Sequence, residues 1–362
     1  MSQTVKFSRT NNAEFVKAVK ANVGNYFKDK KISKFGNYRM VLKSLFMLTL
    51  YLTPYFFIIL ADIENTWIFL GLWAIMGFGM SGIGLSIMHD ANHGSYSKKP
   101  IWNKIMSGAI YLVGANALNW KIQHNVLHHT YTNISGHDQD IDAPFGLLRF
   151  SPHQKRMKIH KYQHFYAWFF YSLLTLTWAF DADFRQIYDF KRLDLIKGYR
   201  KNFSGVMFEL IFFKALYYVY ILAIPMILSS QPWWICLAGF LMMQMISGVV
   251  LASIFQSAHV VPVADFPIPD KDGKMENNWL VHQLHTTANF AQKNKAFTWF
   301  VGGLNHQVEH HLFPTICHVH YPKISKIVKE TAEEYGLPYH SYPTFRSAVA
   351  QHVKLLKDFG RS

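Results

Sequence analysis

Four long apolar stretches set the first-order organisation of the chain. They cover roughly Met40–Leu60, Thr66–Met88, Phe208–Leu228 and Trp233–Phe255. Each is close to the length of about 20 residues that a helix needs to cross a bilayer. Pro54 lies inside the first stretch, where a transmembrane helix tolerates it. The pattern therefore predicts an all-α polytopic membrane protein with four transmembrane helices.

Two shorter apolar stretches lie between the second and third long ones. Ile105–Leu118 contains glycine and is too short to span comfortably, so the pattern favours a helix at the membrane interface. Phe165–Phe180 is apolar enough to count as a further span. The polar regions at the two ends of the chain are predicted to be aqueous, with a helical pattern over Ala13–Phe27.

The positive charges lie almost entirely on one side of this predicted topology. Lysine and arginine number ten in residues 1–43, fifteen in 89–205 and eleven after 256, and the short turns after the first and third spans contain none. This positive-inside pattern places both termini in the cytoplasm. A crossing by Phe165–Phe180 would move the C-terminal region to the other side, so we predict that this helix lies along the interface. The polar N-terminal segment also lacks the apolar core of a cleavable signal peptide.

The composition narrows the functional classes further. Aromatic residues make up 16% of the chain, charged residues only 16%, and the formal net charge is +15. A basic chain could bind nucleic acid, but the sequence has no compact basic motif with interleaved aromatic residues. Anionic membrane lipid explains the charge better, and we predict no nucleic-acid partner. The two cysteines, Cys236 and Cys317, provide no disulfide framework.

Histidine carries the candidate chemistry. An isolated histidine is most simply a hydrogen-bonded or surface residue, but nine of the 19 histidines gather in three motifs or at a span end. The motifs are HDANH (His89, His93), HNVLHH (His124, His128, His129) and HQVEHH (His306, His310, His311), and His259 ends the fourth span. Residues four apart share one face of an α-helix, so each motif is predicted to present its imidazoles together. Three such motifs on one side of the membrane predict a polynuclear metal site.

The number of imidazoles points to two metal ions. Eight or nine nitrogens are too many for one ion but suit two, with about four or five each. Imidazole binds iron, zinc, copper and nickel alike, so the ligand type does not choose the metal. Acidic residues around the motifs could offset the positive charge; the candidates are Asp90, Asp138, Asp140, Asp142 and Glu309. For the stretch GHDQDID, a solvated helix-capping loop is an equal alternative.

The three motifs, the last of them within GGLNHQVEHHLFP, together resemble the three histidine boxes of the membrane fatty acid desaturases. The box spacing, the four-span pattern and His259 also look like that family. The Q-x-x-H-H form at Gln307–His311 is similar to the front-end (Δ5/Δ6-type) branch and its bacterial acyl-CoA desaturase relatives. Segments Trp279–Phe290 and His318–Ser325 look like parts of those relatives too.

This resemblance implies a domain organisation. It covers roughly residues 40–330, which would form the desaturase membrane domain with a cytoplasmic helical cap that holds the metal site. Residues 1–39 would be a cytoplasmic N-terminal segment, and residues 331–362 a cytoplasmic C-terminal tail.

The resemblance also implies an O2-dependent enzyme with two iron ions that inserts a cis double bond into a fatty acyl chain, carried by coenzyme A or by a lipid. It assigns iron ligation to His89, His93, His124, His128, His129, His259, His310 and His311. Gln307 occupies the position where many relatives have the first histidine of the third box. His306 is a departure, because front-end relatives usually have an aromatic residue there. The spacing favours His306 as the further ligand and the family favours Gln307, so both stay open.

The electron donor is expected to be a separate protein, of the ferredoxin or cytochrome b5 type. Residues 1–39 are too short for a fused cytochrome b5 domain and contain no histidine. A hydroxylase or ketolase acting on lipid, alkane or carotenoid would fit the same motifs. A non-catalytic membrane metal-binding protein is the alternative from another class. A metal transporter would place polar ligands inside its spans, whereas the last span holds only Gln244 and a few Ser and Thr.

Overall fold

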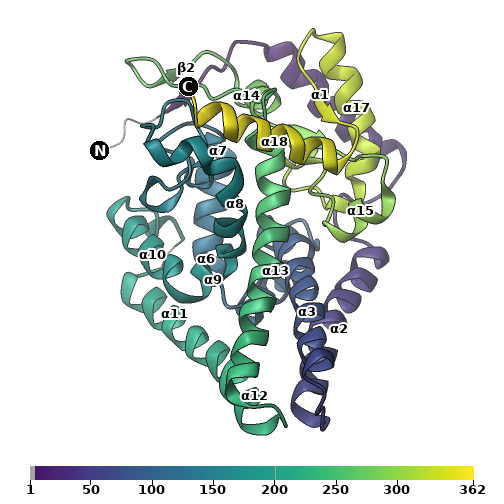
Figure 1. Cartoon of the computed structure of the whole chain (residues 1–362). Coiled ribbons are helices and arrows are strands. Elements are labelled where there is room, and N and C mark those ends of the chain that lie inside the picture. The colour runs from purple at the N-terminus through teal and green to yellow at the C-terminus, as the bar shows by residue number, and fades with distance from the viewer. Residues whose placement is uncertain (1–4, 200) are drawn as a thin grey trace. The chain divides into compact units, whose positions relative to one another are not determined.

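The chain is mostly helical, and the computed structural model describes it over residues 5–199 and 201–362 (Figure 1). It divides into two units. Unit 1 comprises Met1–Asn37, Gln123–Ala167 and Ser253–Ser362, and unit 2 comprises Tyr38–Ile122 and Trp168–Ala252.

Four helices among the described residues are long and apolar enough to cross a membrane, which confirms the predicted number. They are α2 (Tyr38–Leu60); α3 (Thr66–Gly82) continued by η1 (Ile83–Met88) and α4 (His89–Asn92); α11 (Phe203–Tyr218) continued by η9 (Val219–Ala223) and α12 (Ile224–Leu228); and α13 (Trp233–His259). The second and fourth helices run on through His89 and His259, a few residues beyond their predicted ends. His89 and His259 are therefore helical residues of the second and fourth helices.

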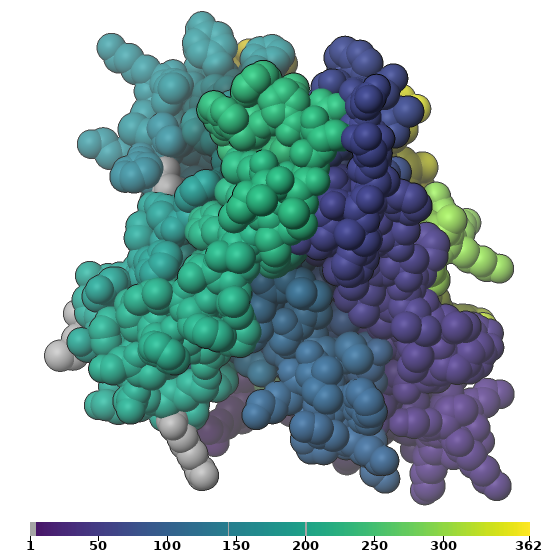
Figure 2. Space-filling view, turned by 90° about the horizontal axis from the view of Figure 1, so that it is seen from below, coloured from purple at the N-terminus to yellow at the C-terminus, as the bar shows by residue number. Residues whose placement is uncertain are grey.

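Glycine allows α2 and α3 to pack closely, side by side (Figure 1). A Cβ atom at Gly79 would lie 2.7 Å from the backbone nitrogen of Tyr51 on α2, closer than real Cβ contacts permit. Small residues that let backbones approach are a common basis of helix association in membranes. Two residues earlier on α3, a Cβ atom at Gly77 would lie 2.9 Å from the carbonyl oxygen of Met243 on α13. In Figure 2 the blue surface of α3 borders the green surface of α13.

The substitution Gly79→Ala should therefore destabilise the protein, whereas Gly71→Ala on the same helix should not. The added methyl at Gly79 must push α2 away, at a cost of roughly 1–3 kcal/mol. A Cβ at Gly71 meets no atom within 4 Å. The measurement is the midpoint of thermal unfolding in detergent for the two variants. Equal midpoints would contradict the close packing of α2 and α3.

The two short turns between the paired spans lie against each other. The Gln231 side chain, between α12 and α13, donates to the carbonyl oxygens of Ile63 (2.8 Å) and Glu64 (2.6 Å), between α2 and α3. Thr66, at the start of α3, donates back to Gln231 Oε1 over 3.0 Å. These bonds place both turns at the same end of the four spans, as an antiparallel arrangement requires.

The two shorter apolar stretches and the residues next to them form short, interrupted helices. Their elements are α5 (Pro100–Ser107), η2 (Gly108–Val113), α6 (Ala117–Trp120), α8 (Gln163–Ser172), α9 (Leu174–Thr177), η7 (Trp178–Ala182) and α10 (Asp183–Arg192). A Cβ at Gly248 of α13 would lie 2.6 Å from the carbonyl oxygens of Tyr171 and Ser172, so the chain packs tightly on α13 next to the break at Leu173. Neither segment is among the four candidate spans. Their position at the membrane interface stays a prediction.

Unit 1 contains the second and third histidine motifs. Its elements are β1 (Lys6–Phe7), α1 (Ala13–Asp29), α7 (His129–Tyr131), η4 (Gln139–Ile141), η5 (Pro144–Gly146), η6 (Lys158–Tyr162), β2 (Lys274–Met275), α14 (Trp279–Thr286), β3 (Ala288–Phe290), α15 (Lys295–Phe300), α16 (Gln307–Leu312), η10 (His318–His320), α17 (Tyr321–Glu334), β4 (His340–Tyr342) and α18 (Phe345–Phe359). Strand β1 pairs with β2, and β3 with β4, both in parallel. The predicted helix over Ala13–Phe27 is confirmed by α1.

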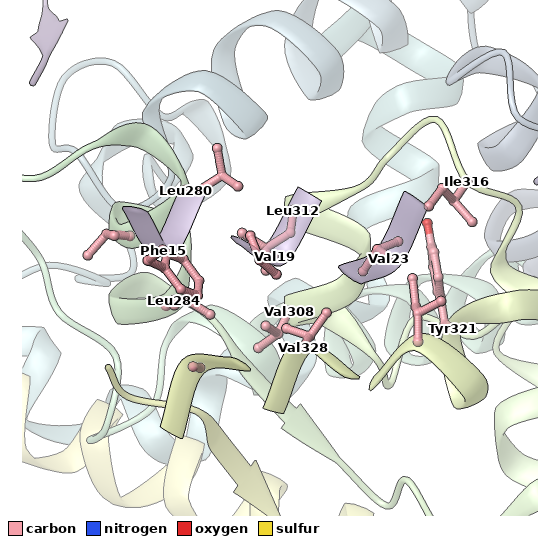
Figure 3. Close-up of a cluster of buried hydrophobic side chains, with 13 residues drawn as sticks. Phe15, Val19, Val23, Leu280, Leu284, Val308, Leu312, Ile316, Tyr321 and Val328 are labelled. Carbon is pink, nitrogen blue, oxygen red and sulfur yellow. The ribbon is translucent and has the colours of Figure 1, made fainter. Parts of the chain in front are cut away.

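An apolar cluster holds α16, the helix of the third motif, in place (Figure 3). Phe15, Val19 and Val23 lie four residues apart on α1 and form one buried face. This face packs with residues of α14, α16 and α17, among them Leu284 and Val308. The N-terminal helix thus supports two helices that carry residues of the candidate site.

The C-terminal residues form part of unit 1. Helix α18 contributes buried side chains such as Leu356, and strand β4 pairs with β3. The guanidinium of Arg149, which is itself buried, donates to the carbonyl oxygens of Phe359 and Ser362 at the end of α18. Cationic groups at a helix C-terminus are stabilising because they meet the unsatisfied carbonyls there. The last helix is therefore docked onto the segment that follows the second motif.

Candidate metal centre

The second motif lies on a π-helical turn, η3 (Lys121–His128), which leads into α7. In a π-turn, residues five apart share a face, rather than the four-residue spacing that the α-helical prediction assumed. The structure accordingly brings His124 and His129 together, with 3.2 Å between their Nε2 atoms. Both side chains are buried.

The third motif contributes His310 to the same point. Its Nε2 atom lies 2.9 Å from Nε2 of His129 and 3.4 Å from Nε2 of His124. Metal–nitrogen bonds of about 2.0–2.1 Å place neighbouring ligand atoms about 3.0–3.4 Å apart. The triangle of nitrogens therefore has the size that one metal ion requires.

A second group of imidazoles adjoins this triangle. His128, His259 and His311 are buried, and each offers a nitrogen within 4.8 Å of the other two. Their ring centroids are 4.7–5.0 Å apart, and the His311 ring stacks on His129 at 4.4 Å. Unit 1 thus gathers six imidazoles from three separated segments into one cluster.

The outer nitrogens of these rings are held by protein acceptors. Nδ1 of His259 lies 3.2 Å from the carbonyl oxygen of Thr286. Nδ1 of His311 lies 2.8 Å from Oε1 of Gln283, whose amide nitrogen donates to the carbonyl of His129. An Nδ1–H that donates outward leaves the Nε2 lone pair facing inward, which is the form that binds a metal.

His128 has the most acidic surroundings of the six. Its Nδ1 lies 3.1 Å from both carboxylate oxygens of Asp138 and 3.3 Å from Oδ2 of Asp140. Burial lowers the pKa of His128, but the two carboxylates outweigh burial and raise it to about 9. The carboxylates provide the negative charge that two metal cations among neutral imidazoles would need.

The donor set fits a metal centre on three observations. The six imidazoles are buried and converge, the nitrogen spacing matches one coordination sphere, and acceptors fix the outward nitrogens of His128, His259 and His311.

Comparison with known families agrees with this reading of the site. The family model described as fatty acid desaturase matches residues 65–343, which is most of the chain. The chain belongs to the fatty acid desaturase family. It is therefore an oxidoreductase that desaturates fatty acyl chains, and with its four apolar helices it is an integral membrane protein.

Individual relatives align with nearly the whole length of this desaturase. It is 34% identical to the sn-1 linoleoyl-lipid 6-desaturase of a Synechocystis species, over 100% of this chain and 99% of that protein. It is 36% identical to the enzyme of the same name from Arthrospira platensis, over 98% and 95% of the two chains. Identity to the acyl-lipid (8-3)-desaturase of Physcomitrium patens is 37%, over 99% of this chain and 74% of that protein.

The first motif of the desaturase lies in unit 2. His89 is the first residue of α4, and His93 is the residue that caps the end of this helix. Their ring centroids are 4.8 Å apart, and both rings pack edge-on against Trp120, at 5.4 and 5.6 Å. Asp90 is buried, with Oδ1 3.7 Å from Nδ1 of His89. The two box-one imidazoles are therefore neighbours, as their spacing predicts.

The other predicted acids differ in their surroundings. Asp138 accepts a hydrogen bond from the Asp140 backbone N–H and so caps a helical turn, and it also contacts His128. Asp138 is therefore buried between a helical turn that it caps and the His128 ring. Asp142 instead accepts from the side chain of Gln154, 2.8 Å away. This hydrogen bond is to a loop residue.

His306 differs from its predicted position. The sequence predicted that His306 and His310 share a helix face, but α16 begins at Gln307 and His306 is the residue before it. Gly302 and Gly303, both at positive φ, turn the chain immediately upstream. Among the described residues, the groups of His, Cys, Asp and Glu with ligand atoms within 4.8 Å of one another do not include His306.

Sequence reasoning missed the partners of the imidazoles. Gln283 lies more than 150 residues from His129, whose carbonyl it binds. Asn133, at φ 60, donates from its side chain to the carbonyl of His259 and from its backbone to Asp138. Tyr321 places its hydroxyl 3.2 Å from Nδ1 of His310. The one signal available was that Gln283 lies in a segment that resembles the front-end relatives.

Proposed function

We propose that this desaturase is a front-end (Δ5/Δ6-type) acyl-lipid desaturase that acts at a pair of iron ions and consumes O2. The convergence of six buried imidazoles in unit 1 is the observation that carries the proposal. The names of the relatives, which specify acyl-lipid and linoleoyl-lipid substrates, support a lipid-linked acyl chain over an acyl-CoA.

The proposed ligand set is the one that the family resemblance assigns. The ligands would be His89, His93, His124, His128, His129, His259, His310 and His311, with Gln307 as the further candidate that the family resemblance supplies. When bound, the iron pair supplies the oxidising power needed to break unactivated C–H bonds.

The protein's own groups would hold and tune this site. Gln283 and the Thr286 carbonyl orient His311 and His259, and Asp138 orients His128. Burial of all these rings keeps bulk water away from the reacting methylenes. The positive-inside charge pattern supports a cytoplasmic site, where a separate donor of ferredoxin or cytochrome b5 type would deliver electrons.

The proposal is tested by fatty-acid profiling of a host whose membrane lipids contain linoleoyl chains and that lacks its own front-end desaturase. The expected result is a new cis double bond at carbon 5 or 6 of lipid-linked chains, with about two iron ions per purified chain. Aerobic formation of a hydroxylated or oxo lipid would favour the hydroxylase or ketolase alternative. One zinc ion in place of iron would contradict the di-iron proposal.

A further inference from the structure

His306 sits in a buried hydrogen-bond network of unit 1 that the histidine boxes do not explain. Its side chain is 1% exposed, and its Nδ1 atom lies 3.2 Å from the amide nitrogen of Gln292. The nearest carboxylate oxygen, Oε2 of Glu309, is 3.7 Å from the same Nδ1, beyond hydrogen-bond distance. Gln292 is therefore the partner of this nitrogen.

Donors and acceptors can be assigned along this network one bond at a time, starting from the Glu309 carboxylate. This carboxylate accepts from the hydroxyl of Tyr339 over 2.8 Å and from the side-chain amide of Asn289 over 3.1 Å. Because a tyrosine hydroxyl has one proton, the Tyr339 oxygen can then only accept. It does so from Asn289 over 2.8 Å and from the amide nitrogen of Gln292 over 3.0 Å.

The same logic fixes which way the Gln292 amide faces. Its Oε1 accepts from the hydroxyl of Ser341 over 2.9 Å. Turning the amide by 180° would set Oε1 against the Tyr339 oxygen, which has no proton left to offer. Gln292 therefore presents its N–H group to Nδ1 of His306, and this nitrogen must accept. In a neutral imidazole, the proton of His306 then lies on Nε2.

This is the reverse of the arrangement at His259 and His311. Those rings face carbonyl-type acceptors with Nδ1, which keeps the proton there and gives Nε2 the lone pair that binds a metal. Nε2 of His306 instead carries a proton, is buried, and has no hydrogen-bond acceptor among the residues that the structure describes. His306 is thus built to donate a hydrogen bond.

We infer that Tyr339 and Gln292 are positioning residues that keep the proton of His306 on Nε2, so that His306 serves the site as a hydrogen-bond donor and not as a metal ligand. The inference rests on the proposed function, since it concerns the same iron site. It leaves the ligand position at the start of the third box to Gln307. It also gives Glu309 a role through Tyr339 rather than through direct contact with the metal ligands.

The first test compares the iron content of purified variants. His306→Phe keeps a ring but has no nitrogen, and His306→Gln can still accept from Gln292 and donate an N–H. Both should retain the iron-to-chain ratio of the wild type, while His310→Ala should lose most of its iron. If His306→Phe and His306→Gln lose iron as His310→Ala does, His306 is a ligand and the inference is wrong.

The second test asks whether Tyr339 acts through His306. Tyr339→Phe and His306→Phe should each lower kcat about tenfold, with KM changed less than twofold, since each removes one oriented donor. The double variant should be no slower than His306→Phe alone, because residues that act in one chain are not additive. Losses that multiply in the double variant would show that Tyr339 acts independently of His306, against the inference. His306→Gln should recover most of kcat.

The two proposals fail in different ways. A wild-type protein without iron or without an unsaturated product contradicts the proposed function. A wild-type protein that binds iron and desaturates lipid, but whose His306→Phe variant is iron-free, contradicts only the role assigned to His306.

Discussion

His310→Ala is expected to reduce unsaturated product to below roughly 1% of wild type, a larger loss than the 10–100-fold typical of residues that only orient a ligand. The Nε2 of His310 is one corner of the nitrogen triangle, 2.9 Å from His129 and 3.4 Å from His124. Alanine removes that corner and has no ligand atom to replace it. The measurements are the fatty-acid profile of the expressing host and the iron content of the purified variant.

His285→Ala is the matched control. His285 is partly exposed and pairs with Asp265 at the surface over 3.0 Å. Exposed ion pairs contribute only about 0–1 kcal/mol, so this variant should keep its iron and its product. Both variants should accumulate in the membrane to similar levels. Undiminished product from His310→Ala, or equal losses in the two variants, would contradict the site.

The local pattern of the sequence predicted the spans and the number of boxes well. Apolar runs report on the bilayer directly, because a helix needs about 20 mainly apolar residues to cross its hydrocarbon core. The four spans therefore follow from the sequence alone, with only their ends shifted, as at His259. The cytoplasmic position of both termini, which rests on the positive-inside charge, stays a prediction.

The geometry within the histidine boxes could not be predicted from the sequence in the same way. A π-turn over Lys121–His128 pairs His124 with His129, whereas α-helical spacing pairs His124 with His128. Such turns occur where packing at a functional site outweighs local preference, so a short sequence does not specify them. The start of α16 at Gln307 likewise depends on the two glycines before it and on their packing, since a Cβ at Gly303 would lie 2.9 Å from Cβ of His318.

The residues that orient the imidazoles were the least predictable. Gln283 and Tyr339 contact residues of the boxes from distant segments of the chain. The hydrophobic periodicity of the sequence does not indicate such contacts. Among the acids, the sequence could not separate Asp138, which contacts His128, from Asp142, which binds Gln154. The conformation of the loop determines which of the two carboxylates lies against His128.

That difference makes Asp138 the most informative acid to change. Its two oxygens accept three hydrogen bonds: from His128, from the backbone N–H of Asn133 over 2.9 Å and from that of Asp140 over 2.9 Å. Asparagine at this position has one oxygen and an amide group that must face one of these donors. His128 would lose its fixed orientation, and its negative partner would lose its charge.

Asp138→Asn is therefore expected to weaken metal binding by about 10–100-fold, in the range seen when the partner of a metal-bound histidine is removed. Asp142→Asn, in the same stretch, should change metal binding less than twofold, because an asparagine oxygen can still accept from Gln154. The measurement is the rate of iron loss to a chelator from the two purified variants, with the fatty-acid profile of each host alongside. Comparable iron loss from both variants would mean that the stretch acts as a capping loop and that the Asp138 carboxylate does not hold His128 for the metal.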